Sequence, residues 1–137
     1  MMGTGGKHQF LFNILQLSSM RLINHTRSIG PISIQVYRSF FEKFRGLMFR
    51  TGLEKDSGIA LQIHPPGVVN ASIHMFFMYF DIAVIWIDQN MKVIDTNLAK
   101  KWRPYYAPKS AASYTIELNR DRLSDFQVDD QVEFANE

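Results

Sequence analysis

Short alternations of apolar and polar residues run along most of this chain, and they predict strands more often than helices. ISIQVY at 32–37 alternates at every position, which is typical of a strand with one buried face. SGIALQIH at 57–64 is a second strand, which Pro65-Pro66-Gly67 is expected to end. Further strands are predicted at residues 21–25, 92–100, 113–119 and 131–134.

The most apolar stretch is SIHMFFMYFDIAVIWID, residues 72–88. A membrane-spanning helix needs about 18 or more consecutive apolar residues, and this stretch is shorter and is interrupted by His74 and Asp81. Its second half is rich in β-branched residues, which favour strands. We therefore predict two buried strands, at residues 73–78 and 81–88, in the middle of a sheet or a closed barrel.

Helices are few in this pattern. Ser39 can cap a short helix over FFEKFRGLM, with apolar residues on one face, and a second short helix is expected near residues 120–125. Many short strands with little helix predict a mainly β fold: a small single-domain β-barrel or sandwich with one or two short helices.

The first 19 residues differ from the rest of the chain. Their apolar run, FLFNILQL, is short and contains Asn13 and Gln16, whereas Met20 opens a stretch that reads as a natural start. We expect residues 1–19 to be an extension outside the fold and residues 20–137 to form one β domain. We expect a cytoplasmic protein; if residues 1–19 act as a signal or anchor, the protein is exported instead.

Composition narrows the candidate chemistry. The chain has no cysteine, which excludes disulfides, zinc–thiolate sites and a cysteine nucleophile. A net charge of +2 is too small to indicate a nucleic-acid partner. The charges are uneven, because residues 38–55 and 92–109 are basic and residues 117–137 are acidic. They can neutralise one another on the folded surface, or the basic segments can face an anionic partner.

Several segments together resemble the family called domain of unknown function 192. They follow the family's order and spacing over about residues 20–137, and they read RGLMFR, SGIALQI, IHMFF, VIWIDQNMKVID, WRPYYAPKSAASYTIEL and FQVDDQVEF. The resemblance implies a compact, mainly β domain with one or two short helices. It implies no activity, because none is established for the family.

Two positions depart from the family's pattern. Where the family has Pro-apolar-Asp, this chain has Asp81-Ile82-Ala83, so that alanine replaces the acid. Asp81 lies two residues earlier, on the same face of a strand, and could partly substitute. Asp129 replaces the family's closing glycine. Both changes weigh against a strictly shared catalytic site.

His74 and Asp81 are the candidate catalytic residues. Histidine titrates near neutral pH, so His74 could act as an acid–base group or bind a ligand, with Asp81 as its orienting partner. It can equally be a histidine at the edge of the core. The other three histidines form no ligand spacing with it, and neither a metal nor a cofactor is indicated.

Two arginines flank the GLMF motif. Arg45 and Arg50 are five residues apart and do not share a helical face. Arg45 can tie the helix to a strand carboxylate, such as that of Asp81 or Asp88, or it can bind an anion at the mouth of the barrel.

The WRPYYAPKS loop interleaves aromatic and basic residues between two prolines. Its candidate ligand-binding residues are Trp102, Arg103, Tyr105 and Lys109. Such a loop can bind a ligand or a protein, or it can plug an open barrel end.

Together these residues favour a non-enzymatic binding or accessory domain. Its expected partner is a small anionic or carbohydrate-like ligand or another protein. The alternative is a small hydrolase or lyase that uses His74 and Asp81. Nucleic acid is a weaker third option, and no membrane span is expected.

Overall fold

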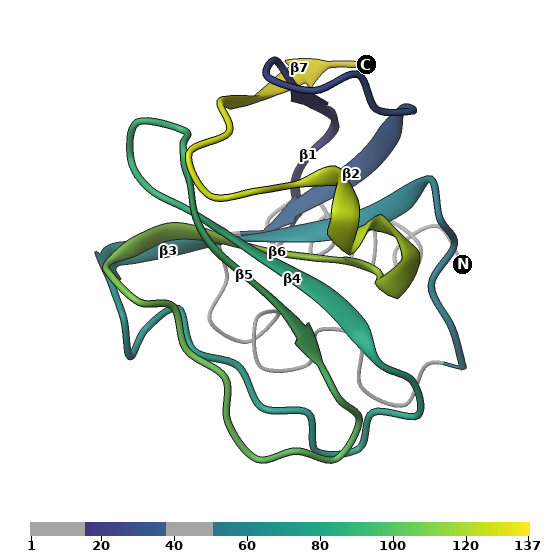
Figure 1. Ribbon diagram of the computed structural model, residues 1–137, viewed down its shortest axis with the longest axis vertical. Helices are drawn as coiled ribbons and strands as arrows, with labels where there is room; N and C mark the ends of the chain where they lie inside the picture. Colours follow the sequence, from purple (N-terminus) through teal and green to yellow (C-terminus); the bar gives the residue numbers. More distant parts are fainter. Residues whose placement is uncertain (1–15, 38–50) are drawn as a thin grey trace, which may run out of the picture.

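A computed structural model describes residues 16–37 and 51–137 of the chain. The fold is mainly β: seven strands form one sheet that curls into a half-barrel (Figure 1). The elements are β1 (Gln16–Asn24), β2 (Ile32–Tyr37), β3 (Ser57–Gly67), β4 (Ile82–Ile87), β5 (Val93–Ala99), β6 (Ala112–Asn119), the 3-10 helix η1 (Arg120–Asp125) and β7 (Val132–Asn136). The mainly β class that the sequence predicts is confirmed.

The strands lie in the order β5-β4-β6-β3-β2-β1-β7. Among the strands of residues 16–37 and 51–137, β2 and β3 pair in parallel and all other pairings are antiparallel. The two edge strands approach each other at one end of the half-barrel, where the amide of Val93 donates to the carbonyl of Asp130 at 2.9 Å and the amide of Val132 donates to that of Met91 at 2.9 Å. The sheet therefore nearly closes at this end.

The side chains of β4 are buried on both faces of the sheet. Ala83, Ile85 and Ile87 join an inner core to which all seven strands contribute. Ile82, Val84 and Trp86 point to an outer core on the opposite face. The strand predicted at 81–88 is observed as β4, an interior strand between β5 and β6, and its unbroken apolar run reflects burial on both faces.

Two long connections cover the outer core, and we call them loop 68–81 and loop 100–111. The indole Nε1 of Trp86 donates to the carbonyl of Ala71 at 2.9 Å, and the hydroxyl of Thr115 donates to the same carbonyl at 3.0 Å. These bonds hold loop 68–81 against the sheet. Ile73, Met75 and Met78 of this loop complete the outer core.

The predicted strand at 73–78 is wrong. Ile73 forms one isolated bridge, to Tyr106, and the chain then turns, with the amide of Met78 donating to the carbonyl of Met75 at 3.3 Å. Phe77 has φ 63°, a left-handed backbone conformation that lies outside the range of a regular strand. Ile73, Met75 and Met78 of this segment pack against the outer face of the sheet instead of forming a strand within it.

Two strand boundaries also differ from those expected. β3 continues past Pro65 and Pro66 to Gly67, with an irregular register after Gln62, and prolines are tolerated at such positions. β1 begins at Gln16, so the boundary expected at Met20 lies inside a strand. Ser19 pairs with Gln35 of β2, and this pairing gives hydrogen-bond partners to backbone groups of β2. The helix expected over FFEKFRGLM lies outside the described residues.

Gly58 of β3 occupies a crowded position. A Cβ atom there would lie 2.8 Å from the carbonyl oxygen of Glu117 and closer still to the side chain of Leu118. The glycine in SGIALQI is therefore explained by the close approach of β6.

Candidate functional site

Backbone hydrogen bonds join loop 68–81 to loop 100–111. Ile73 and Tyr106 exchange two bonds of 2.9 Å, the amide of Met75 donates to the carbonyl of Arg103 at 2.9 Å, and the amide of Trp102 donates to that of Met75 at 2.8 Å. The two loops therefore form one layer, which turns some side chains inward to the outer core and leaves others at the surface.

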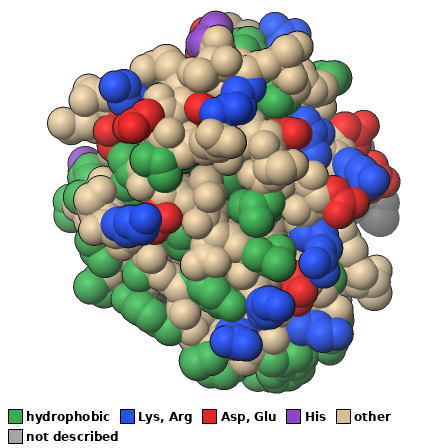
Figure 2. Space-filling view, viewed as in Figure 1, with side chains coloured by type: hydrophobic (Ala, Val, Ile, Leu, Met, Phe, Trp, Pro, Cys, Tyr) green, Lys and Arg blue, Asp and Glu red, His purple; other side chains and the backbone are tan. Residues whose placement is uncertain are grey.

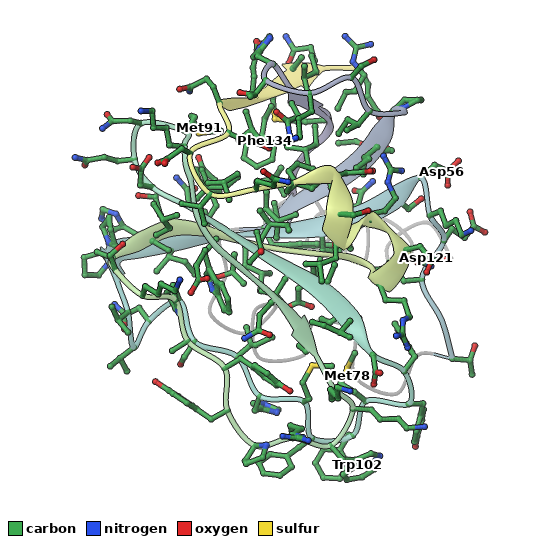
Figure 3. The ribbon with its side chains drawn as sticks, viewed as in Figure 1. Asp56, Met78, Met91, Trp102, Asp121 and Phe134 are labelled. Atoms are coloured by element: carbon green, nitrogen blue, oxygen red, sulfur yellow. The ribbon has the colours of Figure 1, made fainter. Side chains whose placement is uncertain are left out.

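The exposed side chains of this layer include a group of aromatic residues. Five of them are exposed, and together we call them the aromatic surface: Phe76, Phe77, Tyr79, Trp102 and Tyr105. Figure 3 places Trp102 at the lower end of the molecule, where Figure 2 shows hydrophobic side chains gathered beside basic ones. Soluble proteins rarely expose contiguous apolar patches unless the patch binds something.

Phe77 and Trp102 are the most unusual members of this surface. Their rings lie 5.4 Å apart in an edge-to-face arrangement. Both residues have positive φ, 63° for Phe77 and 68° for Trp102, which is rare for bulky side chains. Strain of this kind costs about 1–3 kcal/mol and clusters at binding and catalytic sites.

Three of the exposed basic residues of loop 100–111 lie within two residues of Trp102: Lys100, Lys101 and Arg103. Beside them is a hollow of about 370 Å³, whose lining includes Tyr79, Asp81, Lys101 and Arg120. The aromatic surface thus continues into a recess that carries charged groups.

Asp81 has two partners in this recess. Its carboxylate accepts a hydrogen bond from the amide of Lys101 at 2.8 Å and pairs with the guanidinium of Arg120 at 3.3 Å. These contacts tie the start of β4 to loop 100–111 and to η1. Ala83, which stands where the family has its acid, is fully buried in the inner core.

His74 is half-buried in loop 68–81. Its Nδ1 accepts a hydrogen bond from the amide of Phe76 at 3.2 Å, and its ring lies 5.5 Å from that of Phe76. The contacts described here join Asp81 to Lys101 and Arg120, and they join His74 to Phe76. A catalytic role for His74 and Asp81 stays a prediction.

The loop candidates lie in two places. Trp102, Arg103 and Tyr105 are all exposed on the joined loops. Lys109 is also exposed, but its amide donates to the Asp95 carboxylate of β5 at 3.1 Å, farther along the loop. Arg45 and Arg50 lie outside the described residues, so their anion-binding role stays a prediction.

Sequence reasoning missed Phe76, Phe77 and Tyr79 as surface residues, because it assigned Phe76 and Phe77 to a buried strand. In a strand covered on both faces, Phe76 and Phe77 could both be buried, as the residues of β4 are. The sequence therefore carried no signal that separated this segment from a buried strand.

The structure also contains a buried carboxylate, that of Asp130, which is 2% exposed. It accepts hydrogen bonds from Asn24 at 2.9 Å, from the amide of Gln127 at 2.9 Å and from Arg27 at 2.8 Å. Burial raises the pKa of Asp130, but these bonds and the charge of Arg27 lower it by more, so the pKa lies below its usual value. This group is a structural tie between β1 and the segment that leads into β7.

Two absences hold for the described ranges, 16–37 and 51–137. No helix there is long and apolar enough to cross a bilayer. Nor does this part of the chain bring together three or more His, Asp or Glu side chains that could hold a metal ion.

Solved structures share this fold. A candidate transcription regulator from Sinorhizobium meliloti superposes with a TM-score of 0.74 at 16% identity, covering 85% of this chain and 92% of its own. A protein of unknown function from Novosphingobium aromaticivorans superposes with a TM-score of 0.72 at 21% identity, covering 87% and 86%. At such identities the likeness concerns the fold alone.

Sequence relatives agree with the resemblance noted above. A UPF0127 protein from Thermococcus kodakarensis is 48% identical over 86 residues, which are 61% of this chain and 52% of the relative. The chain thus spans about half the length of that relative. The model of the DUF192 family, described as "Uncharacterized ACR", matches residues 22–134. This chain belongs to the DUF192 family.

Proposed function

We propose that this chain is a non-enzymatic binding domain whose aromatic surface binds an anionic, carbohydrate-like ligand. The observation that carries the proposal is the pair formed by Phe77 and Trp102. Two loops hold these bulky residues in left-handed backbone conformations and present both rings to solvent. A core position, or a loop that plugs the barrel end, would bury such rings. These rings stay exposed although their backbone is strained, and this favours a binding role at the surface.

The surroundings of the pair suit a sugar that carries acidic groups. Aromatic faces can pack against the apolar face of a sugar ring, and Lys101 and Arg103 supply positive charge. The adjacent hollow adds Asp81 and Arg120, whose polar atoms can bond hydroxyl groups. A protein partner would use the same aromatic anchors, and the experiment below separates the two.

The enzymatic alternative has less support. A hydrolase or lyase would need His74 and Asp81 within reach of a shared substrate. Asp81 is instead engaged by Lys101 and Arg120, in the manner of a structural carboxylate.

Binding to polygalacturonate, an acidic polysaccharide, tests the proposal against a neutral glucan of similar length. We expect the wild-type chain to bind the acidic polymer in a salt-sensitive way. Trp102→Ala with Arg103→Ala should weaken that binding at least tenfold while leaving the melting temperature nearly unchanged, because the backbone bonds of both residues remain.

A matched control removes one apolar and one basic side chain near the end of β5 that lies away from Trp102. Val128→Ala with Lys92→Ala suits this purpose, because Val128 is exposed and Lys92 lies at the start of that strand. The control should bind like the wild type. Equal loss in both variants, or no binding by the wild type to the acidic polymer, would overturn the proposal and leave a protein partner as the better explanation.

A further inference from the structure

A second cavity opens at the mouth of the half-barrel, at the other end of the molecule from Trp102. Its volume is about 720 Å³, and its apolar lining comes from four strands and the hairpin between β4 and β5: Met20, Val36, Met91, Tyr114, Val132 and Phe134. Met91 and Phe134 lie near each other in the upper part of Figure 3, far from Trp102. Cavities of roughly 300–1,000 Å³ with apolar walls and a few polar groups are typical of small-molecule sites.

Met91 forms one wall of this cavity in a strained conformation. Its φ is 63°, the left-handed region that favours glycine. The carbonyl of Met91 accepts hydrogen bonds from the amide of Val132 at 2.9 Å and from the side chain of Gln131 at 3.2 Å, which hold the backbone in place. Glycine would adopt this turn more easily than methionine. The position of the Met91 side chain in the cavity lining explains why a methionine is present here.

Part of the lining is aromatic. The rings of Tyr114 and Phe134 contact each other edge to face, with centroids 5.1 Å apart. Methionine side chains are flexible and pack well on aromatic rings, so Met20 and Met91 can adjust to a molecule bound in this cavity. The cavity therefore suits a compact apolar body.

A donor and an acceptor lie at the rim. The Nε2 of His25 lies 2.7 Å from the carboxylate of Glu133, and both side chains are about half exposed. An exposed pair of this kind contributes little to stability. A ligand can therefore replace the contact between His25 and Glu133 with its own hydrogen bonds to the two side chains. A head group that both donates and accepts, such as an amide, complements these two side chains.

We propose that this cavity binds a small neutral molecule with an aromatic or acyl body and an amide head. The site is independent of the aromatic surface, because it uses none of that surface's residues. It would give the domain a second ligand, of a class different from the polysaccharide proposed above.

Fluorescence titration with N-phenyl-1-naphthylamine, an uncharged apolar probe, tests the site in the full chain. We expect enhancement by the wild type and displacement by 3-phenylpropanamide, with weaker displacement by 3-phenylpropanoate because Glu133 repels its charge. Met91→Gly should weaken probe binding at least tenfold without lowering the melting temperature, since glycine suits φ 63°. Phe134→Leu, which keeps an apolar side chain, is the second variant and should also weaken binding.

Trp102→Ala is the matched control and should leave probe binding unchanged. Absence of enhancement by the wild type would overturn the proposal. So would binding that neither Met91→Gly nor Phe134→Leu changes, or a loss caused equally by Trp102→Ala, because the probe would then be bound elsewhere. None of these outcomes bears on polygalacturonate binding, so the two proposals fail separately.

Discussion

The ring of Trp102 packs edge to face on the ring of Phe77, 5.4 Å away, although 24 residues separate them in the chain. Neither ring is hidden by the contact: Phe77 is 44% exposed and Trp102 is 49% exposed. Both backbones are left-handed, so the pair combines strain with exposure. This combination favours the proposed binding surface over a loop that plugs a barrel end.

The strain at Trp102 can be measured with two substitutions. Trp102→Gly should be more stable than Trp102→Ala by about 0.5–1 kcal/mol, because alanine keeps a Cβ atom in the left-handed region and glycine does not. Denaturant unfolding of the two variants compares them directly. An alanine variant at least as stable as the glycine variant would show that the left-handed backbone at Trp102 carries no strain.

Asp129 occupies the position where the family's pattern has glycine, and its φ of 78° explains that preference. Asp129→Gly should leave the free energy of unfolding unchanged or raise it by up to about 1 kcal/mol. Asp129→Val should lower it by about 1–2 kcal/mol, because β-branched residues tolerate this region poorly. The order glycine, aspartate, valine in thermal melts is the expected result, and any order that places valine first contradicts it.

Trp86 is fully buried in β4, an interior strand of the sheet, and is part of the outer core. Trp86→Ala should cost about 3–5 kcal/mol, because it leaves a large cavity and frees loop 68–81 from one of its bonds to the sheet. Thr115→Val removes the other bond to Ala71 and should cost only about 1 kcal/mol. A loss below about 1 kcal/mol for Trp86→Ala, measured by denaturant unfolding, would contradict its central position.

Asp130 should make stability depend on pH. Its pKa is lower in the folded state than in the unfolded chain, so its contribution is complete above the unfolded pKa of about 3.9 and is lost as pH falls through the folded value. Asp130→Asn should cost about 2–3 kcal/mol at pH 7, since bonds to a charged acceptor are lost. Unfolding of both chains at pH 7 and pH 3 should show this difference shrinking in acid. A difference that is constant with pH would mean that the carboxylate's charge is not what binds Asn24 and Arg27.

The start of β1 can be tested by shortening the chain. A chain that begins at Gln16 should melt within about 5 °C of the full chain, because the apolar run before it is short and contains polar residues. Beginning at Met20 instead removes the end of β1 that pairs with β2, and the hydroxyl of Ser19, which accepts from Gln35 at 3.0 Å. We expect this second chain to melt clearly lower, and equal melting of the two would place the fold's boundary at Met20 after all.

Much of the sheet could be predicted from local patterns. Residues 32–37 alternate in the sequence and alternate in burial in the structure, because the period of a strand is two whatever its neighbours are. Residues 82–87 are apolar throughout and buried throughout, because the sheet is covered on both faces. These features depend on each segment's own composition.

The surface and the cavity depended on contacts between distant segments. The HMFF run has the composition of a buried strand, and only its bonds to residues 102–106 turn it into a loop that presents Phe77. Met91 and Phe134 lie more than forty residues apart, and only the curl of the sheet brings both to one cavity. The sequence by itself therefore determined which residues are apolar and which segments with a clear pattern, such as 32–37 and 82–87, are strands. Tertiary structure alone decided which apolar residues face outward, because that choice is made by partners far away along the chain.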